Sequence, residues 1–255
     1  MSPILFNVYM DNLSTQLNSS NYGCTINGIR MNHLMYADDS CIMAPSPTAL
    51  QILLDICKDF AVENSIVYNE KKSKCMCFIP SKLSGLHIPK VYLNGKPLDF
   101  VSEQKYLGVL LNEKFNDDSD IVRQVKALYT RGNLLVKCFK LCSNGIKAHL
   151  FKTYCSSNYC CQLWSNYRRE SLKKCIVAYN DIYRSLFGVQ RGESISQIYV
   201  NNNIDSFKTI LRKNIFSFKK RLLSSDNIIV STIVASVFYN KCSNLTSKWT
   251  TLLYL

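Results

Sequence analysis

The chain has 255 residues, of which 47% are apolar, 19% charged and 11% aromatic. This composition excludes a disordered chain, and it supplies enough apolar surface for one large core or two smaller ones. The best apolar run, residues 228–239, is about half as long as the roughly 20 residues that a transmembrane helix requires. We therefore expect no membrane partner.

The sulfur and imidazole side chains do not form a recognisable metal-binding pattern. The chain contains 12 cysteines and 3 histidines, and no two of the closest cysteines form a C-x-x-C pair, so we expect no zinc site. Asn7 and Asp11 interrupt the first apolar residues, which argues against a secretory signal. The sequence favours reduced thiols in an intracellular protein of the cytoplasm or nucleus.

The basic excess lies in the second part of the chain. Residues 1–115 contain 10 Lys+Arg and 10 Asp+Glu, whereas residues 116–255 contain 21 and 8, so the whole net charge of +13 falls after residue 115. Such an asymmetry predicts that the second part binds a polyanion. A basic helical domain without a polyanion partner stays open as the alternative.

The first part of the chain alternates between helical and strand patterns. Ser2 is a suitable cap, Pro3 suits the first turn of a helix, and Asn-Gly pairs favour tight turns. In chain order we expect a helix over 3–18, a turn at Asn27-Gly28, strands over 29–36 and 40–44, a helix from Ser46-Pro47, strands over 66–68 and 74–79, a hairpin around Asn94-Gly95 and a strand over 106–111.

After about residue 118 the apolar residues follow helical spacing. One series begins with Ile121 and Val125, and another with Phe207 and Ile210. The fold class predicted from these patterns is α+β, with a mixed domain over 1–115 and an all-α basic region over 116–255. The second series runs beside a set of basic residues that we predict to bind nucleic acid: Lys208, Arg212, Lys213, Lys219 and Lys220.

Two adjacent carboxylates, Asp38 and Asp39, lie between the two predicted strands over 29–36 and 40–44. Neighbouring carboxylates repel each other, and a divalent cation bound to both would offset that repulsion. Mg²⁺ suits such a position because it takes oxygen ligands and retains waters that substrate phosphates can replace. The alternative is a simple turn, since Asp is a common turn residue.

Four segments occur in the order found in reverse transcriptases. They are Ser2-Pro3-Ile4-Leu5-Phe6-Asn7, Tyr36-Ala37-Asp38-Asp39, Asn69-Glu70-Lys71-Lys72-Ser73 and Tyr106-Leu107-Gly108. Their spacing, with the insertion over 23–28, resembles the reverse transcriptases of non-LTR (LINE-like) retrotransposons over residues 2–111. The resemblance implies a partial palm domain over 1–115, followed by a thumb-like region over 116–255, and RNA-directed DNA polymerase activity.

The resemblance also implies roles for individual residues. Asp38 and Asp39 would hold Mg²⁺ or Mn²⁺, and Tyr36 and Ala37 would shape the floor beneath the primer terminus. Lys72 would donate a proton to the leaving pyrophosphate or pair with its charge, although it is equally an exposed lysine of a basic turn. Tyr106, Leu107 and Gly108 would hold the primer strand, and the alternative for them is an ordinary strand with a bulge. The implied partners are an RNA template and a DNA primer, and the metal is the one implied cofactor.

One expected part of the family pattern is missing. The fingers and the F-D-x-x-x-F-D-like segment, which supplies another metal-binding aspartate, would precede Ser2. Asp11, Asp55 and Asp59 fall on predicted helices and lack the strand context of a substitute. We therefore expect the chain alone to be an inactive, truncated fragment. Two alternatives are a non-catalytic remnant that binds nucleic acid through its basic helices, and a structural domain with no polyanion partner.

Overall fold

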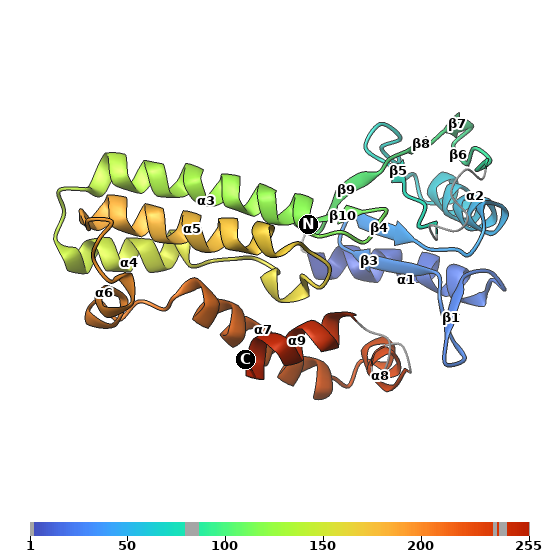
Figure 1. Ribbon diagram of the computed structural model, residues 1–255. Helices are drawn as coiled ribbons and strands as arrows, with labels where there is room; N and C mark the ends of the chain where they lie inside the picture. The colour runs from blue at the N-terminus through green and yellow to red at the C-terminus, as the bar shows by residue number, and fades with distance from the viewer. Residues whose placement is uncertain (1–2, 80–86, 237–238, 240–243, 255) are drawn as a thin grey trace. The chain divides into compact units, whose positions relative to one another are not determined.

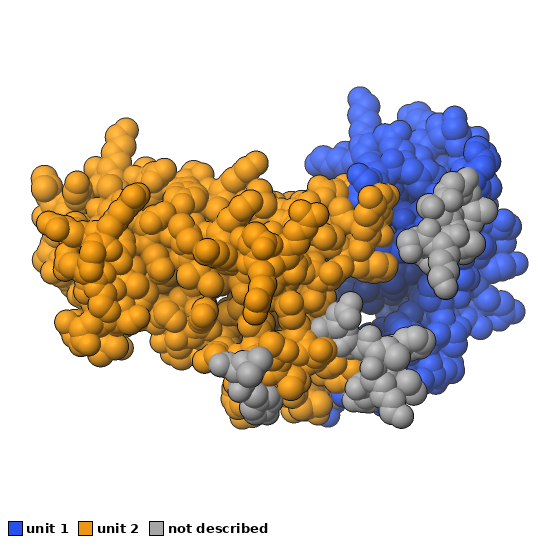
Figure 2. All heavy atoms as spheres, viewed as in Figure 1, with its two compact units in different colours: residues 1–102, 226–236 blue, residues 103–225, 237–255 orange. Residues whose placement is uncertain are grey.

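The computed structural model describes residues 3–79, 87–236, 239 and 244–254. The chain forms two compact units, shown in blue and orange in Figure 2. Unit 1 comprises Met1–Ser102 and Asp226–Ser236, and unit 2 comprises Glu103–Ser225 and Val237–Leu255. Residues 103–115 thus group with the helical unit, while the assignment of palm and thumb domains stays a prediction.

Unit 1 combines helices with short strands, in agreement with the predicted mixture of α and β structure. The predicted first helix is present, and its expected cap Ser2 lies outside the described residues. The elements are α1 (Pro3–Ser19), β1 (Cys24–Ile26), β2 (Ile29–Met31), β3 (His33–Tyr36), β4 (Asp39–Ile42), α2 (Pro47–Glu63), β5 (Lys74–Cys75), β6 (Tyr92–Leu93), β7 (Lys96–Pro97), β8 (Asp99–Phe100) and α8 (Ile228–Ala235).

Helix α2 carries apolar residues to two small cores of unit 1. It begins where predicted, because Ser46 accepts a hydrogen bond from the backbone N–H of Ala49 and Pro47 occupies the first turn. Leu53 and Phe60 pack with Leu13 and Leu17 of α1, and all four side chains are at most 1% exposed. On the other side, Leu54 packs in a second cluster with Cys75, Val91, Leu93 and Leu98.

Among the described residues, the strands of unit 1 pair as four two-stranded sheets. β1–β2, β3–β4 and β6–β7 are antiparallel hairpins, and β5–β8 is a parallel pair. Asn27-Gly28 and Asn94-Gly95 have positive φ angles at both turn residues, which is the type I′ geometry expected from Asn-Gly. Both predicted turns are therefore confirmed.

Several predicted strands are shorter than expected. The strand over 29–36 is interrupted at Asn32, and the strand over 74–79 is limited to Lys74–Cys75 among the described residues. Residues 66–68 form no strand, because Ile66 serves to end α2. Ser65 adopts a left-handed φ of 54°, and the Ile66 N–H donates to the Ala61 carbonyl at 2.8 Å, as in a Schellman cap.

Unit 2 is mainly helical, as predicted for the second part of the chain. Three of its helices, α3 (Asp118–Phe139), α4 (Asn144–Cys155) and α5 (Arg169–Phe187), pack together side by side (Figure 1). The other elements are β9 (Glu103–Tyr106), β10 (Val109–Asn112), the short 3₁₀ helix η2 (Cys161–Leu163), α6 (Ile195–Asn201), α7 (Phe207–Leu223) and α9 (Asn244–Tyr254). Of the helices that the structure describes, none is long and apolar enough to cross a membrane.

An aromatic cluster forms the centre of unit 2. The ring of Phe151 on α4 lies 4.9 Å from that of Tyr179 and 5.2 Å from that of Tyr183, both on α5, in edge-on geometry. Tyr199 and Phe207 add further ring contacts from α6 and α7. These side chains are at most 4% exposed, so the cluster joins the three-helix bundle to α6 and α7.

Helices α3 and α5 approach closely at Gly132, where a β-carbon would lie 2.4 Å from Ile182 Cγ2. We predict that Gly132→Ala lowers the free energy of unfolding by about 1–3 kcal/mol, because the stiff, buried Ile182 side chain must move. Gly145→Ala on α4 is the matched control. It meets nothing within 4 Å and should be neutral or stabilising by about 0.5–1 kcal/mol. Urea denaturation of both variants measures the difference, and equal effects would contradict close packing at Gly132.

Candidate functional site

The two adjacent aspartates lie at the tip of the β3–β4 hairpin, as the sequence predicted. Tyr36 pairs with Asp39 as the last residues of the ladder, and Ala37 and Asp38 form the turn, with a left-handed φ of 51° at Ala37. Both carboxylates are exposed, and the Tyr36 side chain beside them is 65% exposed. No ion pair engages either aspartate in the part of the chain that the structure describes.

A buried amide fixes the base of this hairpin to α1. Asn32, which is 1% exposed, donates from Nδ2 to the carbonyl of Leu17 at 2.6 Å and to that of Tyr22 at 3.1 Å. Gly23 fits against the same side chain, since a β-carbon there would lie 2.6 Å from Asn32 Cβ. The break between β2 and β3 therefore places a polar side chain where it satisfies backbone groups at the end of α1.

His33 extends the same network. Its Nε2 lies 2.8 Å from the Ser14 hydroxyl on α1, and its Nδ1 lies 2.7 Å from Oδ1 of Asn32. Burial disfavours the charged imidazolium and lowers the pKa of His33 from its ordinary value of 6.5. Met35, two residues further along β3, packs against the α1–α2 core, so the inner face of the hairpin is held while Tyr36 and Leu34 remain exposed.

The donor set at the hairpin tip suits a hard divalent cation. Asp38 and Asp39 provide exposed carboxylate oxygens, which Mg²⁺ and Mn²⁺ accept in combination with water and phosphate ligands. Within the described ranges, no third His, Cys, Asp or Glu joins them in a metal-binding group. The aspartate pair therefore fits part of a metal-ligand set.

Lys72 is exposed in the turn that follows α2. Asn69 organises this turn, because its Oδ1 accepts a hydrogen bond from the backbone N–H of Lys72 at 3.1 Å, and its carbonyl accepts from Ser73. Glu70 in the same turn pairs with Lys96 of β7, and this contact holds the pKa of Glu70 below its ordinary value. The Lys72 side chain is left accessible to solvent.

The predicted single strand over 106–111 is wrong, because this segment reverses direction. Tyr106 ends β9 and pairs with Val109 of β10, while Leu107 and Gly108 form the turn with φ angles of 44° and 84°. A β-carbon at Gly108 would lie 2.8 Å from Tyr159, so the turn backbone packs directly on that ring. Tyr106, Leu107 and Gly108 belong to unit 2, whereas Asp38 and Asp39 belong to unit 1.

Residues 1–111 match the reverse transcriptase family. The family is described as "Reverse transcriptase (RNA-dependent DNA polymerase)", and the match includes the Asp38-Asp39 hairpin, the Asn69–Ser73 turn and the Leu107-Gly108 turn. No curated protein matches the chain. The likeness to reverse transcriptases inferred from the sequence is thus supported for this segment.

A buried carboxylate behind the Leu107-Gly108 turn was not predicted from the sequence. Asp120 on α3 is 1% exposed and accepts hydrogen bonds from the Leu110 backbone N–H at 3.1 Å and from Trp164 Nε1 at 2.9 Å. It also pairs with Arg123 at 2.5 Å, and Arg123 donates to the carbonyl of Gly108 at 2.7 Å. Asp120 and Arg123 together attach strand β10 and the turn of the hairpin to α3.

The five basic residues predicted to bind nucleic acid all lie on α7. Arg212 donates to the carbonyl of Leu252 on α9 at 2.8 Å, and Lys213 pairs with Asp205 at 2.6 Å. Lys208 and Lys220 are exposed, and Lys219 is half-buried. These three side chains make no ion pair within the described residues, so their charges are available to an anion.

The charge asymmetry is sharper between the two units than between the predicted domains. Unit 2 holds 23 Lys+Arg and 9 Asp+Glu, whereas unit 1 holds 8 and 9. The aspartate pair thus lies in a unit of nearly balanced charge, and the basic residues lie in the other unit. Phosphate attraction is accordingly concentrated on unit 2.

We predict that acidification weakens unit 1 through His33. Because the pKa of His33 is lowered in the fold, the unfolded chain binds the proton more readily, and the free energy of unfolding falls as the pH drops through 6.5. Urea denaturation followed by far-UV circular dichroism at pH 7.5 and 5.5 measures this loss. The loss should be smaller in His33→Gln and unchanged in His149→Gln, whose side chain is exposed on α4. An equal pH dependence in all three proteins would contradict the prediction.

Proposed function

We propose that the chain is the palm and thumb portion of an RNA-directed DNA polymerase from a non-LTR retroelement. The observation that carries the proposal is the exposed Asp38-Asp39 pair at the tip of a β-hairpin, within the segment that matches reverse transcriptases. In this proposal unit 1 contributes the hairpin that faces the primer terminus. Unit 2 contributes the basic surface that holds the template and primer.

The proposed reaction is attack of a primer 3′-hydroxyl on the α-phosphate of a nucleotide, with release of pyrophosphate. Asp38 and Asp39 would hold Mg²⁺ or Mn²⁺, which when bound would lower the pKa of the primer hydroxyl and neutralise charge on the phosphates. The backbone of Ala37 and the exposed ring of Tyr36 would support the primer terminus beside the carboxylates. Anchoring of the hairpin by Asn32 and His33 keeps these groups in fixed positions relative to α1.

Two other segments would contact the leaving pyrophosphate and the primer strand. Lys72, exposed in the turn organised by Asn69, would neutralise or protonate the leaving pyrophosphate. The turn of Leu107 and Gly108 would hold the primer strand through its backbone, which approaches closely because Gly108 has no side chain. Arg123 fixes this turn through the Gly108 carbonyl.

The aspartate pair needs a further carboxylate for full two-metal catalysis. None joins it among the described residues, and the ranges outside them contain no Asp or Glu. In the proposal, that ligand comes from a reverse transcriptase segment supplied to this chain. Residues 1–255 alone would bind the cation weakly and would not extend a primer.

We predict weak Mn²⁺ binding at the hairpin tip. Titration followed by electron paramagnetic resonance should show bound Mn²⁺ for the wild-type chain, and Asp38→Asn should remove it because one of the two carboxylates is lost. Asp59→Asn, a matched change of an exposed aspartate on α2, should leave it intact. Primer extension on an RNA template should be absent for the chain alone. Extension that Asp38→Asn abolishes would contradict the claim that a carboxylate is missing.

A second candidate function is nucleic-acid binding without catalysis. The observation that favours it is the excess of 14 positive charges in unit 2, which does not depend on the aspartate pair. Under this candidate, the basic helices would bind the phosphate backbone and the hairpin would have no role.

We predict that the full chain binds duplex nucleic acid with little sequence preference and strong salt dependence. Each phosphate contact releases a counterion, so the logarithm of the affinity should fall linearly with the logarithm of salt concentration, with a slope of about −0.9 per contact. Dye-labelled duplexes of unrelated sequence, titrated at several salt concentrations, measure the slope. A flat salt dependence would count against both candidate functions. Both candidate functions predict that Asp38→Asn leaves the binding of the duplex unchanged.

A further inference from the structure

Unit 2 contains a polar hollow that none of the proposed roles uses. It has a volume of about 350 Å³ and lies between the segment over 156–162 and helix α7. Ser157, Tyr159 and Gln162 contribute from the segment, and Asn214, Ser217 and Arg221 contribute from α7. Since Asn214, Ser217 and Arg221 follow helical spacing, one edge of α7 forms a wall of the hollow.

The opposite wall is held in place by local backbone geometry. Cys160 adopts a left-handed φ of 58°, after which Cys161–Leu163 form the 3₁₀ helix η2. The Asn214 amide donates to Cys161 Sγ at 3.3 Å, and Trp249 Nε1 donates to the Gln162 carbonyl at 2.8 Å. The hollow is therefore formed before any ligand arrives, which reduces the entropy cost of binding.

The lining of the hollow suits an anion. Its lining residues include no Asp or Glu, so it offers no carboxylate to a hard cation and no negative charge that would repel an anion. Arg221 has no carboxylate partner among the described residues, and its guanidinium lies 5.8 Å from the centre of the Phe218 ring. Hydroxyl and amide groups of Ser157, Ser217 and Asn214 add further donors beside that charge. The volume of the hollow is ample for a phosphate group of a nucleic acid strand and lies at the low end of the range for small-molecule pockets.

One residue of the hollow also contacts the turn proposed to hold the primer. Tyr159 lines the hollow, and its ring packs against Gly108, as the 2.8 Å approach of a β-carbon at that position shows. The Tyr159 carbonyl also accepts a hydrogen bond from Gln124 on α3 at 3.4 Å. Since both features lie within unit 2, a strand that crossed the Leu107-Gly108 turn would reach the hollow across the Tyr159 ring.

We propose that this hollow binds a phosphodiester group of a nucleic acid strand, with Arg221 as its charged ligand and Ser217 and Asn214 as hydrogen-bond donors. The proposal rests on the nucleic-acid-binding part of the proposed function. It adds a defined subsite on the edge of α7 near Arg221, a residue outside the five predicted basic residues. A strand held both at the turn and in the hollow is fixed at two points, which sets its direction across unit 2.

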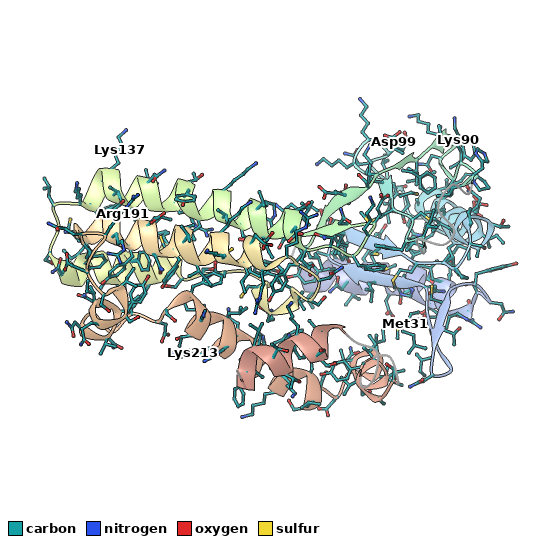
Figure 3. The ribbon with its side chains drawn as sticks, in the orientation of Figure 1. Met31, Lys90, Asp99, Lys137, Arg191 and Lys213 are labelled. Carbon is teal, nitrogen blue, oxygen red and sulfur yellow. The ribbon has the colours of Figure 1, made fainter. Side chains whose placement is uncertain are left out.

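The first test compares two charge-removing variants of the full chain. Binding of a dye-labelled 12-nucleotide DNA strand is measured for the wild type, Arg221→Gln and the control Lys137→Gln. Lys137 is exposed and points away from α3 in Figure 3, so its loss removes the same charge from the same unit. Loss of a charge-assisted hydrogen bond to phosphate should weaken binding about tenfold in Arg221→Gln. In Arg221→Gln, the slope of the logarithm of affinity against the logarithm of salt concentration should also become shallower by about the value of one phosphate contact. Lys137→Gln should change the affinity less than twofold.

A second pair of variants adds a charge in place of removing one. Ser217→Glu places a carboxylate where the phosphate would bind, and Thr130→Glu adds the same charge on the exposed face of α3. Ser217→Glu should weaken strand binding at least as much as Arg221→Gln, and Thr130→Glu should have a small effect. Circular dichroism confirms that each variant is folded.

The outcomes separate this inference from the proposed function. If the wild-type chain does not bind the strand at low salt, both fail. If the wild type binds, but Arg221→Gln and Ser217→Glu match their controls on α3, the subsite alone is wrong. Competition with inorganic phosphate provides a further arm. The displacement of the strand from the wild type by sodium phosphate is compared with that by sodium chloride at the same ionic strength. Stronger displacement by phosphate is expected if the hollow recognises phosphate. Equal displacement by the two salts would overturn the proposal.

Discussion

A two-stranded hairpin is marginally stable in water, and both hairpins proposed to contact the primer are of this kind. Each one depends on a buried polar side chain for its position. Asn32 joins the β3–β4 hairpin to the end of α1, and Asp120 with Arg123 joins the β9–β10 hairpin to α3. Because a buried amide or carboxylate is costly without partners, each anchor favours one geometry over nearby alternatives. The exposed turns are thereby positioned without a large sheet beneath them.

In the proposed function, the two units would divide the chemistry that a polymerase requires. The carboxylates proposed to hold a divalent cation occur on a unit with nearly balanced charge, and the basic residues proposed to bind phosphates occur on a strongly basic unit. This separation avoids pairing Asp38 and Asp39 with lysines or arginines of their own unit, which would compete with a metal ion. Under the proposal, substitutions in one unit would alter nucleic-acid affinity and substitutions in the other would alter metal affinity.

Local patterns in the sequence were sufficient to predict some structural elements and not others. The Asp38-Asp39 turn could be predicted because apolar strands flank it, and the Asn-Gly turns could be predicted because both residues accept positive φ. The turn at Leu107 and Gly108 was hidden in an apolar run, since Leu rarely adopts the φ of 44° seen there. Asp120 was missed for a different reason. Its partners Leu110 and Trp164 are distant in sequence, and its pairing with Arg123 three residues away resembles any surface helix pair.

The hydrogen bonds of the two indole groups have a practical consequence. Trp164 donates to Asp120 and Trp249 donates to the Gln162 carbonyl, and these are the 2 tryptophans of the chain. Both belong to unit 2, and each reports on a different support of the proposed strand-binding surface, one behind the Leu107-Gly108 turn and one behind the polar hollow. Intrinsic tryptophan emission is therefore a selective probe of unit 2. Unit 1, including the aspartate hairpin, is silent in such an experiment unless a tryptophan is introduced there.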